Sequence, residues 1–211
     1  MKFRGRLKFV QYNPSKRSRF GIKFYKLCES KTGYCLKFKI YTGKEEKKED
    51  SQNKKDSKLT RKLEEIVLEF IENYKNQGHT LYLDNWYSSP DLFLILRELG
   101  FNVIGTVRQN IKNLPRESFI KLEKGETQIF SSNNIFLLRW SDKKIVNLLS
   151  TKHSSIDFKD TKNKNNKIIK KPKAIIDYNN GMGGINLMDQ YLANFPTMRR
   201  YLKGYKKIFF I

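Results

Sequence analysis

The stretch HTLYLDNWYSSPDLFLILRELGFNVIGTVR, residues 79–108, constrains the fold of this chain more than any other. Residues 80–83 form a short β-prone run, and residues 101–108 return as an apolar, β-branched run. Between them, leucines recur at helical spacing, at Leu92, Leu96 and Leu99. Ser88 or Ser89 is suited to cap this helix, Pro90 suits its first turn and Gly100 suits its end. The order of strand, helix and strand predicts an α/β fold.

Asp84 lies where the first of these strands ends and just before the helix begins. Open α/β sheets place their chemistry at this kind of position. On position alone, however, an aspartate after a strand is more often a turn former or a helix cap. The charge of the chain favours a functional role, because 43 Lys and Arg stand against 21 Asp and Glu, a net charge of +22. We interpret an acid at a strand end of so basic a protein as part of a metal site that faces a polyanion.

The excess of positive charge favours a nucleic acid over an acidic metabolite or other small-molecule substrate. The alternative is an AT-rich coding sequence, which produces abundant Lys, Asn and Ile without selection for binding. No run of about 18 apolar residues is present, so we expect no membrane span. Cys28 and Cys35 flank a turn and are expected to be reduced thiols. With His79 and His153 as the only histidines, the chain offers no zinc cluster of usual spacing.

Turn residues between two β-prone segments, 21–30 and 33–44, predict a hairpin in the first part of the chain. Residues 44–58 contain no apolar side chain and are expected to form a solvated linker. Residues 59–78 are the clearest helix, with apolar side chains on one face.

The second half of the chain changes character. Residues 112–170 lose helical periodicity and are interpreted as a β-rich insertion. Residues 174–195 predict a strand-like start, a glycine-rich turn and a helix from about Ile185. Asn186 and Asp189 are three residues apart and are therefore neighbours on that helix.

Polar groups thus fall near the ends of three expected elements: Glu29 after the first strand, Asp84 after a later strand, and Asn186 with Asp189 on a late helix. This is the layout of a ribonuclease-H-like nucleotidyl transferase, in which such groups hold two Mg²⁺ ions. Oxygen ligands suit Mg²⁺, and the scarcity of histidine is consistent with them. We expect these four residues to converge in the folded chain.

An ordered series of motifs resembles the piggyBac transposase family. These are FRGRLKFVQYNPSKRSRFGIKFYKLCES with TGY, YLDNWYSS, GTVRQN, KGE with RWSDKKIVNLLST, and DYNNGMGGINLMDQ, and together they cover nearly the whole chain. The resemblance implies an α/β, ribonuclease-H-like mixed sheet with flanking helices and a β-rich insertion. It also implies cut-and-paste DNA transposition with hairpin intermediates and TTAA target sites, a nuclear location, Mg²⁺ as cofactor, and DNA and a second copy of the chain as partners.

The resemblance assigns catalytic and metal-binding roles to the four residues named above. Asp84 matches the second aspartate of the family and Asp189 its fourth acid. Glu29 stands where the family has its first aspartate, and Asn186 where it has its third. Glu29 extends its carboxylate further from the backbone and Asn186 carries no charge, while Mg²⁺ tolerates little geometric error. We therefore expect impaired strand cleavage.

The expected organisation is a first part of the core over residues 1–110, a β-rich insertion over 111–174, and a return to the core with the last catalytic helix over 175–211. Relative to the family, the chain looks truncated, without the N-terminal DNA-binding region and the C-terminal cysteine-rich zinc domain. The first functional hypothesis is an impaired transposase catalytic domain. The alternative is a non-catalytic, domesticated or decayed DNA-binding derivative. A basic RNA-associated protein is a third class, which clustered acids argue against.

Overall fold

The structure is a computed structural model that describes residues 3, 7–16, 19–43, 58–162, 166 and 168–194. The chain divides into two compact units: Met1–Asp56 with Gly183–Ile211, and Ser57–Met182. Most of the linker expected at residues 44–58 and the end of the chain from residue 195 lie outside the described residues. The two units are therefore considered one at a time.

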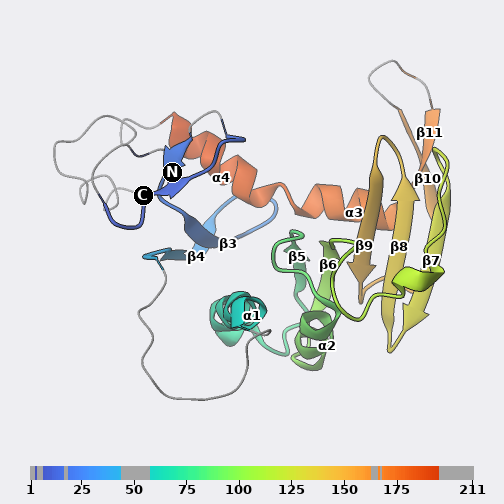
Figure 1. Ribbon diagram of the computed structural model, residues 1–211, viewed down its shortest axis with the longest axis horizontal. Coiled ribbons are helices and arrows are strands. Elements are labelled where there is room, and N and C mark those ends of the chain that lie inside the picture. Colours follow the sequence, from blue (N-terminus) through green and yellow to red (C-terminus); the bar gives the residue numbers. More distant parts are fainter. Residues whose placement is uncertain are drawn as a thin grey trace. The chain divides into compact units, whose positions relative to one another are not determined.

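The second unit is built on a five-stranded mixed sheet with the strand order β5-β6-β9-β8-β7 (Figure 1). Strands β5 and β6 run parallel, whereas the other neighbouring pairs run antiparallel. Such a mixed sheet confirms the expected α/β class. The strands are β5 (Thr80–Leu83), β6 (Asn102–Thr106), β7 (Thr127–Ser132), β8 (Ile135–Ser141) and β9 (Ile145–Ser150).

Helices cover both faces of this sheet (Figure 1). Helices α1 (Lys58–Ile71) and α2 (Pro90–Glu98) share one apolar cluster with Val103 of β6, and α3 (Lys173–Gly181) shares the other with Ile104. Alternate residues of a strand point to opposite faces, so Val103 and Ile104 at the centre of β6 are both apolar because both faces of the sheet are buried there. A 3-10 turn, η1 (Glu72–Tyr74), follows α1. Among the described residues, no helix is long and apolar enough to cross a membrane.

The ends of α2 follow the signals expected from the sequence. The Ser89 hydroxyl accepts the Leu92 N–H at 3.1 Å, and Pro90 occupies the first turn. Gly100 then adopts a φ of +81°, a conformation that favours glycine. A Cβ at Gly100 would also lie 2.7 Å from the Cα of Asn76. The predicted cap, first-turn proline and glycine stop are all confirmed.

The segment from residue 111 to residue 174 is rich in strands, but it is not the separate subdomain expected from the sequence. Its strand β9 pairs with β6, so β7, β8 and β9 continue the sheet that carries Asp84. The paired residues are 42 to 46 positions apart in the chain, from Thr106 with Leu148 to Ile104 with Ser150, and periodicity within a short segment cannot predict such a pairing. Among the described strands of this segment, β10 (Phe158–Lys162) and β11 (Ile168–Pro172) lie outside the main sheet and form a two-stranded sheet.

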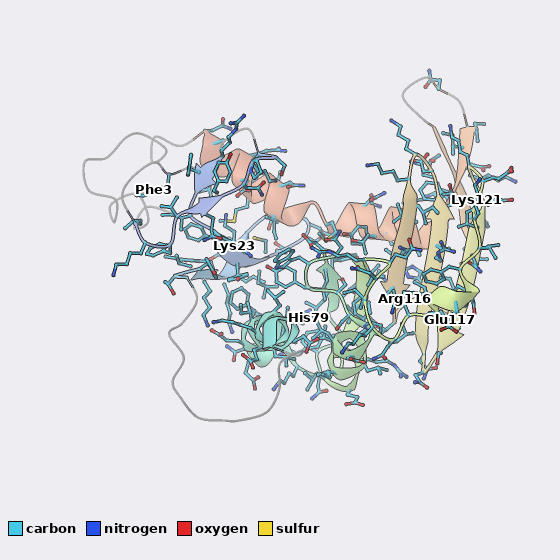
Figure 2. The ribbon with its side chains drawn as sticks, in the orientation of Figure 1. Phe3, Lys23, His79, Arg116, Glu117 and Lys121 are labelled. Atoms are coloured by element: carbon cyan, nitrogen blue, oxygen red, sulfur yellow. The ribbon has the colours of Figure 1, made fainter. Side chains whose placement is uncertain are left out.

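A buried arginine of β8 links β7 and the segment before it to this side of the sheet through hydrogen bonds. Arg139 is 2% exposed and donates to the Ile120 carbonyl at 3.1 Å and to the Gln128 side chain at 2.5 Å. Its burial lowers the pKa of its guanidinium. The segment that leads into β7 contains η2 (Arg116–Ser118) and Lys121, and it runs along this side of the sheet (Figure 2). Neutral oxygens therefore satisfy this buried charge.

Residues 174–181 are helical, which corrects the strand-like start expected for them. Ala174 and Ile175 are each 4% exposed and pack on the face of the sheet formed by Ile104 and Leu148. The run Ala-Ile-Ile is β-prone by itself, but burial of one helical face decides its conformation. Helix α3 therefore forms where an isolated segment would favour a strand.

The first unit contains the predicted hairpin and the predicted late helix. The hairpin forms as β3 (Phe24–Cys28) and β4 (Cys35–Ile40), paired antiparallel in a two-stranded sheet. A second small sheet pairs β1 (Gln11–Tyr12) with β2 (Phe20–Gly21). Helix α4 (Gly184–Ala193) contacts β3. The late helix thus begins one residue before the expected Ile185.

Gly105 of β6 is predicted to be essential for the close packing of the β5–α2 turn. A Cβ at this position would lie 2.6 Å from the Ser88 Oγ and 2.8 Å from the Leu83 carbonyl oxygen. We expect Gly105→Ala to lower the free energy of unfolding by about 1–3 kcal/mol, since overpacking costs about this much. Urea unfolding measures the change. Gly183→Ala is the control, because its Cβ would meet nothing within 4 Å; equal stability of the two variants would contradict the prediction.

Candidate active site

Asp84 lies immediately after β5, in a turn that its own atoms organise. Its carboxylate accepts the Trp86 N–H. Its carbonyl oxygen accepts the N–H groups of Tyr87 at 3.1 Å and Ser88 at 3.2 Å, and the Ser88 hydroxyl at 3.0 Å. Asp84 is thus a turn former, as its position alone favours. The same bonds fix its carboxyl group at the edge of the sheet where α2 begins.

The parallel register places the end of β6 at this same edge. Leu83 is paired with Gly105, so the residues that follow the two strands leave the sheet together. Arg108, two residues beyond β6, places its guanidinium carbon 5.0 Å from the centre of the Trp86 ring. The edge therefore carries an acid, an exposed aromatic ring and a cation.

Two further residues approach Asp84 from β6 and α3. The Tyr178 hydroxyl and the Thr106 hydroxyl lie 3.2 Å apart. Burial raises the pKa of Tyr178, and the charge of Asp84 raises this pKa further, whereas the hydrogen bond with Thr106 acts in the opposite direction. Tyr178 is therefore a neutral hydroxyl near Asp84. The sequence motifs contain both residues, but no spacing rule links positions 72 apart.

Helix α3 approaches β5 closely because it ends in glycine. A Cβ at Gly181 would lie 2.1–2.3 Å from atoms of the Tyr82 ring. Tyr82 belongs to β5 and lies two residues before Asp84 in the chain. Burial is the main cause that raises the Tyr82 pKa, followed by the charge of Asp177. The α3 side of the sheet edge is thus formed by neutral phenols.

In the first unit, Glu29 follows β3 and packs by its backbone against the start of α4. A Cβ at Gly184 would lie 2.5 Å from the Glu29 carbonyl oxygen, so glycine permits this approach. The Glu29 carboxylate is exposed and accepts the Thr32 hydroxyl. The hairpin turn is closed by the Glu29 N–H, which donates to the Tyr34 carbonyl at 2.8 Å.

Asn186 and Asp189 lie on α4 and are both exposed. Lys26 of β3 donates from its Nζ to the Asp189 Oδ1 at 3.0 Å, with 11% of the lysine side chain exposed. Between the two polar positions on the helix, Met188 is buried and its sulfur lies 3.5 Å from the Cys28 sulfur. Burial, together with the neighbouring Cys35, raises the pKa of Cys28 to about 12. An apolar thiol contact and an ion pair thus hold α4 on the hairpin.

The packing of α4 on the hairpin places Glu29, Asn186 and Asp189 in one unit, while Asp84 belongs to the other. Among the described residues, no three or more His, Cys, Asp or Glu side chains form a group that could hold a metal ion. Convergence of all four residues stays a prediction. Their donor atoms are carboxylate and amide oxygens, and this chemistry fits Mg²⁺.

The side chains of a serine, a histidine and an aspartate contact one another in a row on the α3 side of the second unit. Ser150 Oγ is 2.8 Å from His153 Nδ1, and His153 Nε2 is 3.1 Å from the Asp177 carboxylate. His153 and Asp177 border a pocket of about 200 Å³. Ser150, however, is fully buried and accepts the N–H groups of Lys152 and His153. This arrangement ties the β9 end to α3 and offers no accessible nucleophile.

Comparison with known proteins agrees with the family resemblance of the motifs and with the fold. A family model described as Transposase IS4 matches residues 1–211. The chain belongs to the piggyBac transposase family. It is 27% identical to human PiggyBac transposable element-derived protein 3 and covers 35% of that protein with 95% of its own length. It is also 24% identical to human PiggyBac transposable element-derived protein 2, with 66% of the chain covering 26% of that protein.

A solved structure, the piggyBac transposase synaptic complex with hairpin DNA, shares the fold of this chain. The TM-score is 0.79 at 24% sequence identity, over 99% of this chain and 41% of the other. The likeness confirms the ribonuclease-H-like fold expected from the motifs. The chain spans about a third or less of the two curated human relatives. Activity of a whole transposase is therefore a matter for proposal.

The Tyr178 phenol is predicted to make stability fall at alkaline pH. Its pKa is raised in the folded state, so folding favours the neutral phenol. That contribution is complete below the ordinary pKa of 10.0 and is lost as the pH rises through the raised value. We expect wild-type protein to lose more unfolding free energy than Tyr178→Phe between about pH 8 and about pH 11. Tyr191→Phe, at a residue 52% exposed, is the control; equal losses in wild type and Tyr178→Phe would contradict the prediction.

Proposed function

We propose that this chain is the DNA-cleaving core of a piggyBac-type transposase in an impaired form. The position of Asp84 carries the proposal: its carboxyl group is fixed at the carboxyl edge of the parallel β5–β6 pair, beside the start of α2. Family membership and the net charge of +22 support DNA as the substrate. The protein is proposed to act in the nucleus and to form a homodimer on DNA.

Glu29, Asp84, Asn186 and Asp189 are the residues that would hold Mg²⁺. When bound, such ions activate a water or a 3′-hydroxyl and stabilise the leaving oxygen. Asp84 contributes a fixed carboxylate, and Tyr178 contributes a neutral hydroxyl near it. Glu29 reaches further from the backbone than an aspartate does.

Impairment is proposed from the charge at α4. Asn186 contributes no negative charge, and the charge of Asp189 is already balanced by the ammonium group of Lys26 at 3.0 Å. A divalent cation would therefore meet less negative charge at α4 than two aspartates provide. The same two observations favour the second candidate function, a DNA-binding derivative without cleavage activity.

Restoring the two altered acids is predicted to restore cleavage. We expect Glu29→Asp with Asn186→Asp to nick duplex DNA in Mg²⁺ at least about tenfold faster than the unmodified chain, because restoring one transition-state interaction of about 1.4 kcal/mol gives this factor. Calorimetric titration should show tighter Mg²⁺ binding by the double variant than by either single variant, because ligands of one site are not additive. The control adds Asp84→Asn to the double variant and should abolish both gains.

Two results would count against this proposal. If the unmodified chain cleaves DNA and binds Mg²⁺ as well as the double variant, Asn186 is not a lost ligand. If the double variant binds DNA but neither cleaves it nor binds Mg²⁺ more tightly, the non-catalytic derivative is the correct function.

DNA binding by the unmodified chain is predicted to weaken steeply with salt. Lysine and arginine outnumber the acids by 43 to 21, and each phosphate that they neutralise contributes about −0.9 to the slope of log affinity against log salt. Fluorescence anisotropy with a labelled duplex measures this slope. Affinity that does not change between low and physiological salt would rule out binding driven by phosphate contacts.

A further inference from the structure

The parallel strands bring an indole and a guanidinium together beside Asp84. Trp86 lies in the turn after β5, and Arg108 lies two residues beyond the end of β6. Because Leu83 and Gly105 are in register, both segments leave the sheet at one edge. The guanidinium carbon of Arg108 lies 5.0 Å from the centre of the Trp86 ring, within the range of a cation–π contact.

Trp86 is held at the surface, unlike the other tryptophan of the chain. Trp86 is 43% exposed, whereas Trp140 is 5% exposed within the apolar cluster on the α3 side of the sheet. The main chain of Trp86 is fixed, since its N–H donates to the Asp84 carboxylate. Arg108 is exposed as well. A large aromatic surface is thus presented to solvent from a defined turn, with a permanent positive charge beside it.

These two groups match the two parts of a nucleotide. A nucleobase stacks on an indole whatever its identity, because every base has a π-face. A guanidinium pairs with phosphate oxygens, often through two hydrogen bonds. In duplex DNA the base faces are stacked on one another, so only an unpaired base can use the indole in this way.

We propose that Trp86 and Arg108 form a binding site for one unpaired nucleotide of a DNA strand, with the base on the indole and its phosphate on the guanidinium. The inference rests on the proposed function, because the bound nucleotide would belong to the DNA strand whose backbone passes Asp84. Asp84 and Trp86 are joined through the hydrogen bond of the turn, so a base held on Trp86 positions the adjoining phosphate near the acid. The site selects distorted or single-stranded DNA over an intact duplex.

Intrinsic fluorescence tests the stacking directly, because the chain contains only two tryptophans. We titrate the full chain with single-stranded oligothymidylate in EDTA, so that binding is measured without cleavage. We expect the oligonucleotide to quench the wild-type emission by a third or more, roughly the exposed tryptophan's share, and to leave Trp86→Phe, which retains only buried Trp140, nearly unchanged. Trp140→Phe should retain the quenching; should this core variant not fold, the difference between wild type and Trp86→Phe still isolates Trp86.

Affinities separate a binding role from a structural role of the turn. We expect Trp86→Ala to weaken binding of the single strand by about five- to 100-fold, the range of base–aromatic stacking, and binding of a duplex by less than about twofold. Arg108→Gln should reduce the salt slope for the single strand by about 0.7. Arg97→Gln is the matched control, because it removes an exposed arginine in the last turn of α2, which runs back toward the opposite edge of the sheet.

The outcomes are distinguishable from those for the proposed function. Equal quenching in wild type and Trp86→Phe, or equal loss of single-strand and duplex affinity in Trp86→Ala, overturns the nucleotide site even if DNA cleavage is observed. Quenching that depends on Trp86, with selective loss of single-strand affinity, supports the site even if no variant cleaves DNA.

Discussion

The close parallel pairing of β5 with β6 is the constraint on which the candidate site depends. The register that joins Leu83 to Gly105 brings the residues after both strands to one edge. The turn that holds Asp84 fits there only because position 105 has no side chain, since a Cβ would lie 2.8 Å from the Leu83 carbonyl oxygen. Ser89 then starts α2 a few residues later. Glycine at position 105 thus permits the close packing of the turn that carries Asp84 after the neighbouring strand.

Helix α3 completes this edge and sets its electrostatic character. Its glycine end lies against the Tyr82 ring, and Tyr178 reaches Thr106 at the end of β6. Both phenols have a raised pKa, mainly because they are buried. The edge near Asp84 therefore carries the buried phenols of Tyr82 and Tyr178 from β5 and α3, and Arg108 beside the exposed Trp86 ring. Under the proposed function, the charge of Arg108 would attract a polyanion to this side of Asp84.

Local chemistry made the elements around Asp84 predictable, whereas long-range pairing did not. The cap at Ser89, the proline at position 90 and the glycine at position 100 act within one turn of their helix, and all three were identified from the sequence. The pairing of β9 with β6 joins strands that are separated in the chain by η2, β7 and β8, so the sequence pattern does not reveal that β9 continues the sheet. The β preference of Ala-Ile-Ile predicts a strand at the start of α3, and this prediction is wrong because burial of one helical face against the sheet overrides that preference. Tyr178 could not be linked to Asp84 without that packing.

The sequence predicts the environment of some of the four candidate site residues better than that of others. Motif matching identified the substitutions at Glu29 and Asn186, but it could not show that Lys26 balances Asp189. Under the proposed function that ion pair bears on impairment, because the Lys26 ammonium group offsets the negative charge that Asp189 would offer to a metal ion. Asn186→Asp alone would add a charge beside an acid that already has a partner. Under the proposed function, a metal ion would have to compete with Lys26 for Asp189, and a carboxylate at position 186 would help it to do so. This competition would make the effects of aspartates at positions 29 and 186 interdependent.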